Sequence, residues 1–279
     1  MRQKQYLIIG GSGEAGQSAL EELRNSQPNA LLVATTTGSS EIGGADITLT
    51  NISADHHITQ NISSQLNSKN ISQEWEALIY TPALGEVGYP IRQTSKEALS
   101  SALSISYDPL VLLEKEFKPK LSIGYSAFYW LPHTLSFYGS MGYVKLIMDE
   151  WALTSPSNRK IIRAGTFYSK SVRGISLILQ RSLKTTQEEE LLDLKNKFQS
   201  SQLKFQDFFL EYAWNHEREY FADKAEDSPY RATTRSDLGR GLRYALQIEE
   251  PIITVLGDWT WKENQLPYLP DWFQSKELL

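Results

Sequence analysis

The stretch at residues 137–145, FYGSMGYVK, places two tyrosines and a lysine close together. A lysine ammonium near a phenol favours the phenolate and lowers the pKa of the tyrosine, which makes it a usable acid near neutral pH. On a helix, Tyr138 and Lys145 lie about two turns apart on one face with Met141 between them, whereas Tyr143 points elsewhere. The spacing makes Tyr138 and Lys145 a candidate reactive pair. The alternative is a surface helix with an exposed lysine.

Glycines near the start of the chain form a second motif. A short apolar run at residues 6–9 leads into GGSGEAGQSALEELRN, whose second half is amphipathic over residues 15–24. Strand, glycine turn and helix in this order predict a dinucleotide site, because glycines let the backbone approach a pyrophosphate at the helix N-terminus. A plain glycine turn is the alternative. The residues assigned to the pyrophosphate are Gly10, Ser12, Gly13 and Gly16.

The second expected strand, residues 30–34, is followed by TTTGSS. An acidic residue at this point would bind the ribose hydroxyls and repel a 2′-phosphate. The chain has Thr35 and Thr36 here instead, and no acid. This favours NADP(H) slightly over NAD(H). A polar loop that only caps the next turn is the alternative for each hydroxyl.

The elements that must position these residues alternate along the whole chain. Expected strands cover residues 6–9, 30–34, 47–49, 77–80, 121–125, 160–163 and 252–255. Expected helices cover residues 15–24, 58–66, 95–103, 109–117, 134–151 and 236–246, with a mostly helical block at 182–221. This alternation predicts a Rossmann-type, doubly wound parallel α/β sheet of about seven strands, in a single domain over residues 1–279.

Ligands of such sheets gather outside the carboxyl ends of the strands. Besides the glycine turn, Thr35 and Thr36, the residues assigned there to the cofactor are Asn51, Ile52, Thr81, Pro82, Ala83, Lys145, Gly165 and Thr166. The lysine contributes because its ammonium can hydrogen-bond a ribose. The position of the Tyr138 and Lys145 stretch after a fifth strand in a dinucleotide fold favours the reactive pair over a surface helix.

Composition excludes several other kinds of function. The net charge is −5 and the chain has no cysteine, so neither a nucleic-acid partner nor a thiolate site is expected. No apolar run approaches the ~18 residues of a membrane span, and the N-terminal apolar run is too short for a signal peptide, so we expect a cytoplasmic protein. The four histidines lack partners at metal-ligand spacing, so we expect no metal site. His133 is expected near solvent in a loop.

Together these motifs resemble the short-chain dehydrogenase/reductase superfamily over nearly the whole chain. That superfamily usually carries Tyr-x-x-x-Lys, whereas Met141 stands four residues before Lys145 here. The segment YGSMGYVK is similar to the Tyr-(x)6-Lys variant of the enoyl-acyl-carrier-protein reductases. The resemblance implies that Tyr138 hydrogen-bonds the thioester carbonyl or enolate oxygen, and that Lys145 binds the nicotinamide ribose.

The same resemblance implies roles for further residues. It places Phe128, Tyr129 and Met141 at the substrate, makes Ser126 a candidate hydrogen-bonding serine, and brings RAGTFYS, with Gly165, Thr166 and Ser169, to the nicotinamide carboxamide. It implies an enlarged helical substrate lid at about residues 169–227, a homodimer or homotetramer, and a small-molecule or acyl-thioester substrate.

Three functions are compatible with these observations. The first is NAD(P)H-dependent reduction of a C=C bond conjugated to a thioester or ketone. The second is carbonyl reduction by an enzyme of the same superfamily. The third is a dinucleotide-binding protein without catalysis, which the missing Tyr-x-x-x-Lys and the segment TPALG, in place of the usual NAG, both favour.

Overall fold

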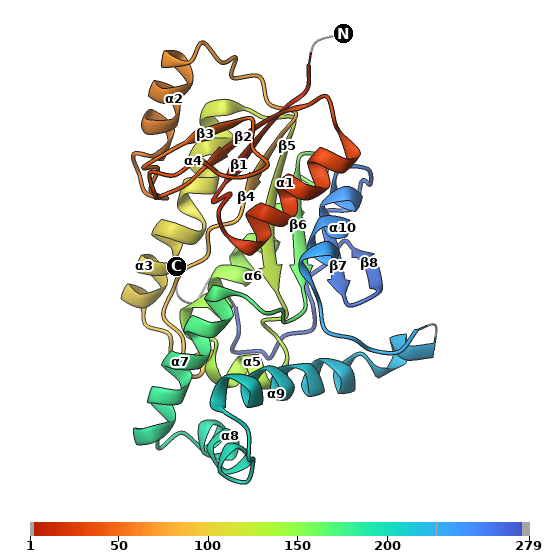
Figure 1. Ribbon diagram of the computed structural model, residues 1–279. Helices are drawn as coiled ribbons and strands as arrows, with labels where there is room; N and C mark the ends of the chain where they lie inside the picture. The colour runs from red at the N-terminus through yellow and green to blue at the C-terminus, as the bar shows by residue number, and fades with distance from the viewer. Residues whose placement is uncertain (1–2, 227, 275–279) are drawn as a thin grey trace.

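The computed structural model describes residues 3–226 and 228–274 (Figure 1). Its centre is an eight-stranded sheet with the order β3-β2-β1-β4-β5-β6-β7-β8, in which only β8 runs antiparallel to its neighbour. The strands are β1 Gln5–Ile9, β2 Leu31–Thr35, β3 Ile47–Leu49, β4 Ala77–Tyr80, β5 Leu121–Ala127, β6 Arg159–Ala164, β7 Ile252–Leu256 and β8 Trp259–Glu263. The Rossmann-type fold predicted from the sequence is therefore confirmed.

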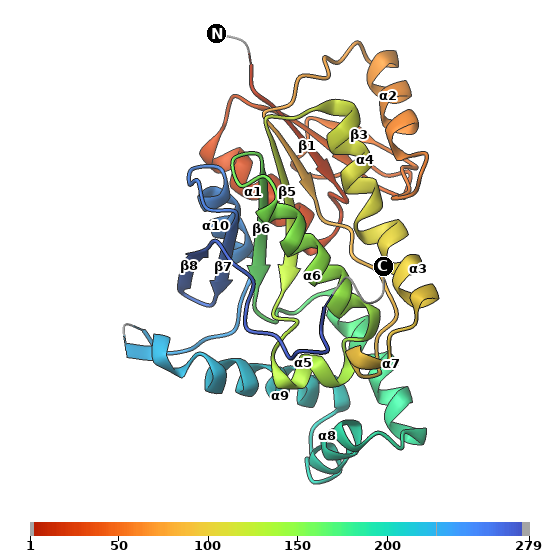
Figure 2. The same cartoon turned by 180° about the vertical axis from the view of Figure 1, so that it is seen from behind.

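Helices cover both faces of this sheet. They are α1 Glu14–Ser26, α2 Ile58–Ser68, α3 Lys96–Ser106, α4 Asp108–Phe117, α5 Pro132–Phe137, α6 Gly139–Leu153, α7 Lys170–Thr185, α8 Glu189–Gln199, α9 Phe205–Tyr220 and α10 Arg235–Ala245, with 3-10 turns at Ile91–Gln93 and Ala222–Glu226. Tyr6 and Ile8 of β1 pack with α1 and α10, whereas Leu7 and Ile9 pack with α2, α3, α4 and α6. Figures 1 and 2 show these two layers from opposite sides. Alternate residues of a strand point to opposite faces, so this sheet is buried on both sides.

The eighth strand was not predicted from the sequence. It forms a hairpin with β7 through Gly257, which has a φ of +53°. Its sequence, WTWKE, mixes aromatic and polar residues and has no apolar run, because this strand lies at the edge of the sheet.

The expected helix at residues 134–151 is broken into α5 and α6. Tyr138 lies between the two helices and Gly139, at the start of α6, has a φ of +48°. A side chain at Gly139 would place Cβ only 2.5 Å from the carbonyl oxygen of Glu86. The break follows from this left-handed glycine, which a continuous helix cannot contain.

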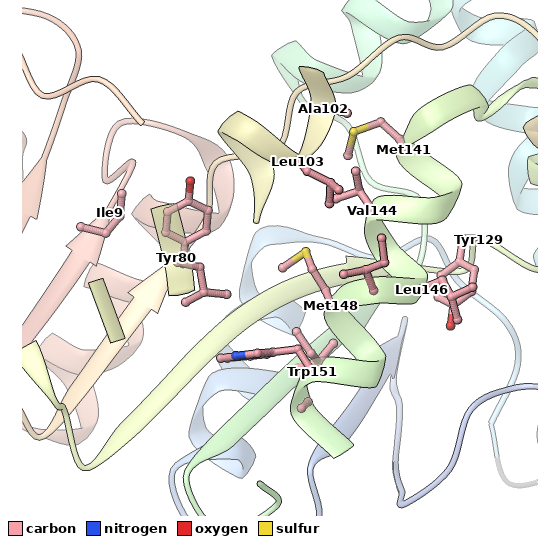
Figure 3. Close-up of a cluster of buried hydrophobic side chains, with 14 of the residues drawn as sticks. Ile9, Tyr80, Ala102, Leu103, Tyr129, Met141, Val144, Leu146, Met148 and Trp151 are labelled. Atoms are coloured by element: carbon pink, nitrogen blue, oxygen red, sulfur yellow. The ribbon is translucent and has the colours of Figure 1, made fainter. Parts of the chain in front are cut away.

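Helix α6 is buried on nearly every side, which its almost uniformly apolar sequence requires. Met141, Val144 and Met148 extend towards α3 and β4, whereas Tyr129 lies on the other side of the helix (Figure 3). Phe273, near the end of the described chain, packs edge-on against Tyr129 and Tyr143.

Helices α7, α8 and α9 pack mainly on one another and lie beside the carboxyl ends of the strands (Figure 1). Their shared core contains Leu179, Leu183, Leu191, Leu194, Phe205, Phe208 and Phe209, together with Phe137 of α5. Most aromatic side chains of the predicted lid therefore serve as helix core. No helix in the described part of the chain is long and apolar enough to cross a membrane.

Candidate functional site

The glycine turn joins β1 to α1 at the carboxyl edge of the sheet. Gly10 has a φ of +77°, and its amide donates to Oγ1 of Thr35 at 3.1 Å. The amide of Gly11 donates to the carbonyl oxygen of Thr35 at 2.9 Å. The end of β2 therefore holds the turn in one conformation.

The glycines of this turn have separate structural roles. A Cβ on Gly16 would lie 2.3 Å from the carbonyl oxygen of Gly10, so only glycine lets α1 pack this closely on the turn. A Cβ on Gly13 would meet only the carbonyl oxygen of Gly10, at 3.6 Å, and Gly13 is the N-cap of α1 without a side-chain cap. Glu14 in the first turn of α1 is paired with Arg235 of α10, which offsets its negative charge. Glycines have three roles in dinucleotide-binding turns: one permits the tight turn, one leaves room for the pyrophosphate, and one lets the helix pack closely. Gly10, Gly13 and Gly16 match these roles in that order.

Side chains at the ends of β2 and β3 are used by the protein itself. Thr35 accepts a hydrogen bond from Gly10, and Oγ1 of Thr36 accepts one from the amide of Gly38 at 3.1 Å. Ile52 is buried, and its amide donates to the carbonyl oxygen of Thr36 at 2.9 Å. Asn51 is exposed and has a φ of +55°. Each of these hydroxyl oxygens thus accepts a hydrogen bond from a local turn, and the binding of a cofactor by Thr35 and Thr36 stays a prediction.

The segment that follows β4 covers the start of α6. Thr81 Oγ1 donates to the carbonyl oxygen of Ile9 at 2.8 Å, Pro82 is half-buried and Ala83 is exposed. Further along, the amide of Gly88 donates to the carbonyl oxygen of Phe137 at 2.7 Å. The amides of Gly139 and Ser140 donate back to the carbonyl oxygens of Tyr89 and Glu86, both at 3.0 Å. The Tyr138 region is therefore bound to this segment on both sides.

Tyr138 packs at the border of two apolar clusters and is half-buried. Burial raises the pKa of Tyr138 to about 12. The expectation that a neighbouring ammonium lowers this pKa is therefore wrong, and so is the expected placement of Tyr138 and Lys145 on one helix. The role of Tyr138 in catalysis stays a prediction.

Lys145 lies on the face of α6 that meets β5. Its amine donates to the carbonyl oxygen of Tyr125 at 2.7 Å, and the residue is 4% exposed. Burial lowers the pKa of Lys145 to about 8, although the carboxylate of Asp149 opposes the shift. The amine thus lies buried beside the carboxyl-terminal half of β5, and its binding of a nicotinamide ribose stays a prediction.

A buried ion pair lies one turn further along α6. Nε of Arg163, on β6, lies 2.8 Å from Oδ2 of Asp149, and both side chains are fully buried. Glu263 of β8 also binds this arginine, at 2.9 Å. The hydroxyls of Ser126 and Tyr129 face the carboxyl group of Asp149. Ser126 is therefore placed at an internal ionic network, and its assignment as a catalytic serine stays a prediction.

The sequence did not single out Asp149 or Arg163. Each interrupts an otherwise apolar run, Asp149 together with Glu150 in LIMDEWAL and Arg163 directly after two isoleucines in KIIRA. A charge inside a buried element needs a partner of opposite sign, so the presence of both charges in apolar elements was the signal available.

The three side chains assigned to the substrate lie in the core. Phe128, Tyr129 and Met141 are 3%, 0% and 5% exposed. Met141 points towards Ala102 of α3 (Figure 3). Binding of substrate by these residues stays a prediction, and it would require the surrounding core to open.

The residues that follow β6 are bound by helix α9. The amide of Thr166 donates to Oε1 of Glu217 at 2.6 Å, and its carbonyl oxygen accepts from Nε1 of Trp214 at 2.9 Å. A Cβ on Gly165 would lie 3.2 Å from Oε2 of Glu217. Ser169 is the N-cap of α7, accepting from the amide of Val172. Nothing in the local sequence indicated that Glu217 reaches this loop.

His133 lies in the interior and not near solvent as expected. It is 2% exposed, and its ring stacks on His216 of α9 with centroids 4.9 Å apart. Burial and the neighbouring histidine lower the pKa of His133 to about 3. Residues 3–226 and 228–274 contain no group of three side chains able to hold a metal ion.

A surface pocket of about 280 Å³ lies at the opposite, amino edge of the sheet, next to Tyr6 and Lys160. The amine of Lys160 donates there to the carbonyl oxygens of Pro156 and Glu249. The pocket is thus remote from the glycine turn, and its buried cation is already bound by the protein.

Comparison with known proteins defines the fold further. No protein-family model matches the chain, and no curated protein matches it. A short-chain dehydrogenase family protein from Francisella tularensis superimposes with a TM-score of 0.58 at 14% identity, over 89% of this chain and 93% of that one. A short-chain dehydrogenase from Leptospira borgpetersenii, solved with bound NAD+, gives 0.56 at 12% identity over 92% of both chains.

A small-chain dehydrogenase in complex with NADPH gives a TM-score of 0.55 at 10% identity, over 92% of this chain and 98% of that chain. These likenesses establish that the chain has the fold of short-chain dehydrogenases. At such identities the chemistry must be argued from the site itself.

Proposed function

We propose that this protein binds a nicotinamide dinucleotide at the glycine turn and uses it as a reductase. The observation that carries the proposal is the division of roles among Gly10, Gly13 and Gly16, which leaves the N-terminus of α1 open to a pyrophosphate. A glycine turn that served only the fold would need the tight turn and the close helix contact, but not the open approach at Gly13.

The cofactor we propose is NADP(H) in preference to NAD(H). No carboxylate lies directly at the end of β2, and Thr35 and Thr36 occupy the place from which an acid would repel a 2′-phosphate. Relatives of the same fold have been solved with NAD+ and with NADPH, so the fold itself accommodates either.

The reaction we propose is reduction of a C=C bond conjugated to a thioester or ketone. The bound cofactor would supply a hydride. Tyr138 keeps its proton throughout the neutral range, because its pKa is about 12, and donates a hydrogen bond to the substrate oxygen that gains charge. An ammonium has three donors, and Lys145 uses two of them, on the carbonyl oxygen of Tyr125 and on the sulfur of Met148, so one remains for a ribose.

Two alternatives differ from this proposal in their chemistry. Carbonyl reduction would use the same residues on a ketone, and levodione reductase shares the fold with a TM-score of 0.57 at 12% identity. A dinucleotide-binding protein without catalysis is favoured by one specific observation, the binding of both main-chain groups of Thr166 by helix α9.

The test begins with binding. Titration of the protein with NADPH and NADH, followed by nicotinamide fluorescence, is expected to show saturable binding, tighter for NADPH. Loss of reduced-nicotinamide absorbance is then followed with a crotonyl thioester, a longer enoyl thioester and a panel of ketones. We expect Tyr138→Phe to lower turnover by roughly 10²-fold or more and to leave cofactor affinity unchanged.

Each result selects one function. Turnover of enoyl thioesters alone supports the first proposal, and turnover of ketones alone supports carbonyl reduction. Binding without turnover on any substrate supports the non-catalytic protein. If neither nucleotide binds, all three are wrong.

A further inference from the structure

Two side chains of helix α9 hydrogen-bond the main chain just after the carboxyl end of β6. Glu217 accepts from the amide of Thr166 at 2.6 Å, and Trp214 donates to its carbonyl oxygen at 2.9 Å. Thr166 comes two residues after Ala164, the last residue of β6, and in open α/β sheets ligands bind at this edge. In Figure 1, α9 runs across this edge below the tips of β5 and β6. An incoming carboxamide would need the same donor and acceptor that α9 now uses.

Glu217 is an unusual residue for such a contact. It is 1% exposed, and its second oxygen accepts from the hydroxyl of Tyr230 at 3.0 Å. Within residues 3–226 and 228–274 it has no salt-bridge partner among the ion pairs of the structure. A buried carboxylate without a counter-charge is costly, and burial raises the pKa of Glu217 to about 7.

The groups that face Glu217 do not titrate in the neutral range. Burial raises the pKa of Tyr230, so its phenol stays protonated. Arg218 lies over the ring of Tyr230, 5.2 Å from its centroid, on the exposed side. Gly165 after β6, Leu256 at the end of β7 and Thr233 in the segment before α10 lie around the same point, and none of them is charged.

We propose that Trp214 and Glu217 form a pH-sensitive clasp, which closes the β6 edge when Glu217 is protonated and opens it for the nicotinamide end of the dinucleotide when Glu217 ionises. This inference rests on the proposed function and adds a regulation of the same site. In the open state Thr166 offers its amide and its carbonyl oxygen to the carboxamide.

The direction of the effect follows from the two pKa values. Glu217 has a pKa of about 7 in the clasp and the ordinary value of 4.5 when released to solvent. The clasped state therefore binds the proton more tightly, so the clasp is most stable below the released pKa and is lost as the pH rises through 7. Because each pKa unit corresponds to a tenfold change, the affinity for NADPH should increase by roughly tenfold or more between about pH 5.5 and about pH 8.

The experiment compares NADPH affinity at these two pH values in four proteins. Wild type should show the full increase. Glu217→Gln has no charge, keeps an acceptor for the amide of Thr166, and can donate from its amide nitrogen to the hydroxyl of Tyr230. It should therefore bind NADPH weakly at both pH values. The double variant Trp214→Phe with Glu217→Ala should bind tightly at both. Glu211→Gln, which changes an exposed acid on the same helix, should behave as wild type.

Hydrogen exchange in the absence of any nucleotide provides an independent measurement. After correction for intrinsic rates, a peptide containing Thr166 should lose protection between the lower and the higher pH in wild type, and keep it in Glu217→Gln. His216, next in the chain, has a pKa lowered by burial and titrates in both proteins, so it cannot account for a difference between them.

The two proposals can fail separately. If no protein binds NADPH but Thr166 loses protection with rising pH only in wild type, the proposed function is wrong and the clasp is supported. If Glu217→Gln shows the same pH dependence of affinity and of exchange as wild type, the clasp is overturned. If the double variant does not fold, hydrogen exchange at Thr166 in wild type and in Glu217→Gln still tests the clasp.

Discussion

The amine of Lys145, on α6, donates a hydrogen bond to the carbonyl oxygen of Tyr125, on β5, at 2.7 Å in the interior of the protein. This bond ties the most buried helix to the carboxyl end of a central strand. It places an ammonium beside the edge of the sheet at which the cofactor is expected to bind. Burial of this charge away from water is unfavourable.

That cost predicts a pH-dependent stability. The pKa of Lys145 is about 8 in the folded protein, against the ordinary lysine value of 10.5, so the unfolded chain holds the proton more tightly between these values. Stability therefore rises with pH over this window, where wild type should gain roughly 3 kcal/mol in free energy of unfolding relative to Lys145→Met. Urea unfolding at about pH 7.5 and about pH 10.5 measures this difference. Lys197→Met, at an exposed position, keeps Lys145, so its stability should rise with pH as in wild type, and wild type should gain nothing relative to it. An equal gain of wild type over both variants would contradict the prediction.

The buried pair of Asp149 and Arg163 predicts a large loss of stability on truncation. Arg163→Met leaves the carboxylate of Asp149 buried without a cation, which should lower the free energy of unfolding by about 3–5 kcal/mol. Adding Asp149→Leu should restore much of the loss, because the remaining acid of the network, Glu263, is partly exposed and keeps its hydrogen bond from Thr254. Denaturant unfolding of both variants tests this. Asp193→Asn, which breaks an exposed pair on α8, should cost less than about 1 kcal/mol. If Arg163→Met alone is as stable as wild type, solvent must reach the carboxylate of Asp149.

Substitutions at two glycines of the turn distinguish a role in folding from a role in nucleotide binding. Gly16→Ala places a methyl group 2.3 Å from the carbonyl oxygen of Gly10, so both stability and NADPH affinity should fall. Gly13→Ala meets no close atom, so stability should stay within about 1 kcal/mol while NADPH affinity falls roughly tenfold or more. Thermal unfolding and nucleotide titration of both proteins measure the two effects. Unchanged affinity in Gly13→Ala would mean that no pyrophosphate rests on this turn.

Much of the fold could be predicted from the sequence because the determinants are local. The runs YLII, ALLVA and ALIY are continuous and apolar, as strands buried on both faces must be, and the glycine turn follows directly from the first of them. The break at Tyr138 could not be predicted in this way. It depends on Gly139 packing against Glu86 and Tyr89, which are about 50 residues away in the chain.

The site was predicted less well for the same reason. The spacing of Tyr138 and Lys145 suggested a shared helix face, but the burial of each side chain depends on the segment after β4 and on β5. Glu217 reaches Thr166 across 51 positions of sequence, and Asp149 meets Arg163 across 14. Contacts of this kind are set by the packing of whole elements, so no local pattern carries them.

Met141, finally, stands where the common reductase motif has its tyrosine, and restoring that residue provides a sharp test of the geometry. Its sulfur would lie 2.7 Å from a Cβ on Gly85, and its side chain points to Ala102, so the space around it is closed (Figure 3). Met141→Tyr should therefore overpack the contact between α3 and α6 and lower the free energy of unfolding by about 1–3 kcal/mol without raising turnover. Met141→Leu, which conserves volume, should cost less than about 1.5 kcal/mol. Thermal unfolding and the nicotinamide absorbance assay compare the two. Higher turnover in Met141→Tyr at unchanged stability would show that a phenol at this position reaches the cofactor edge, and Tyr138 would then lose its claim to the catalytic role.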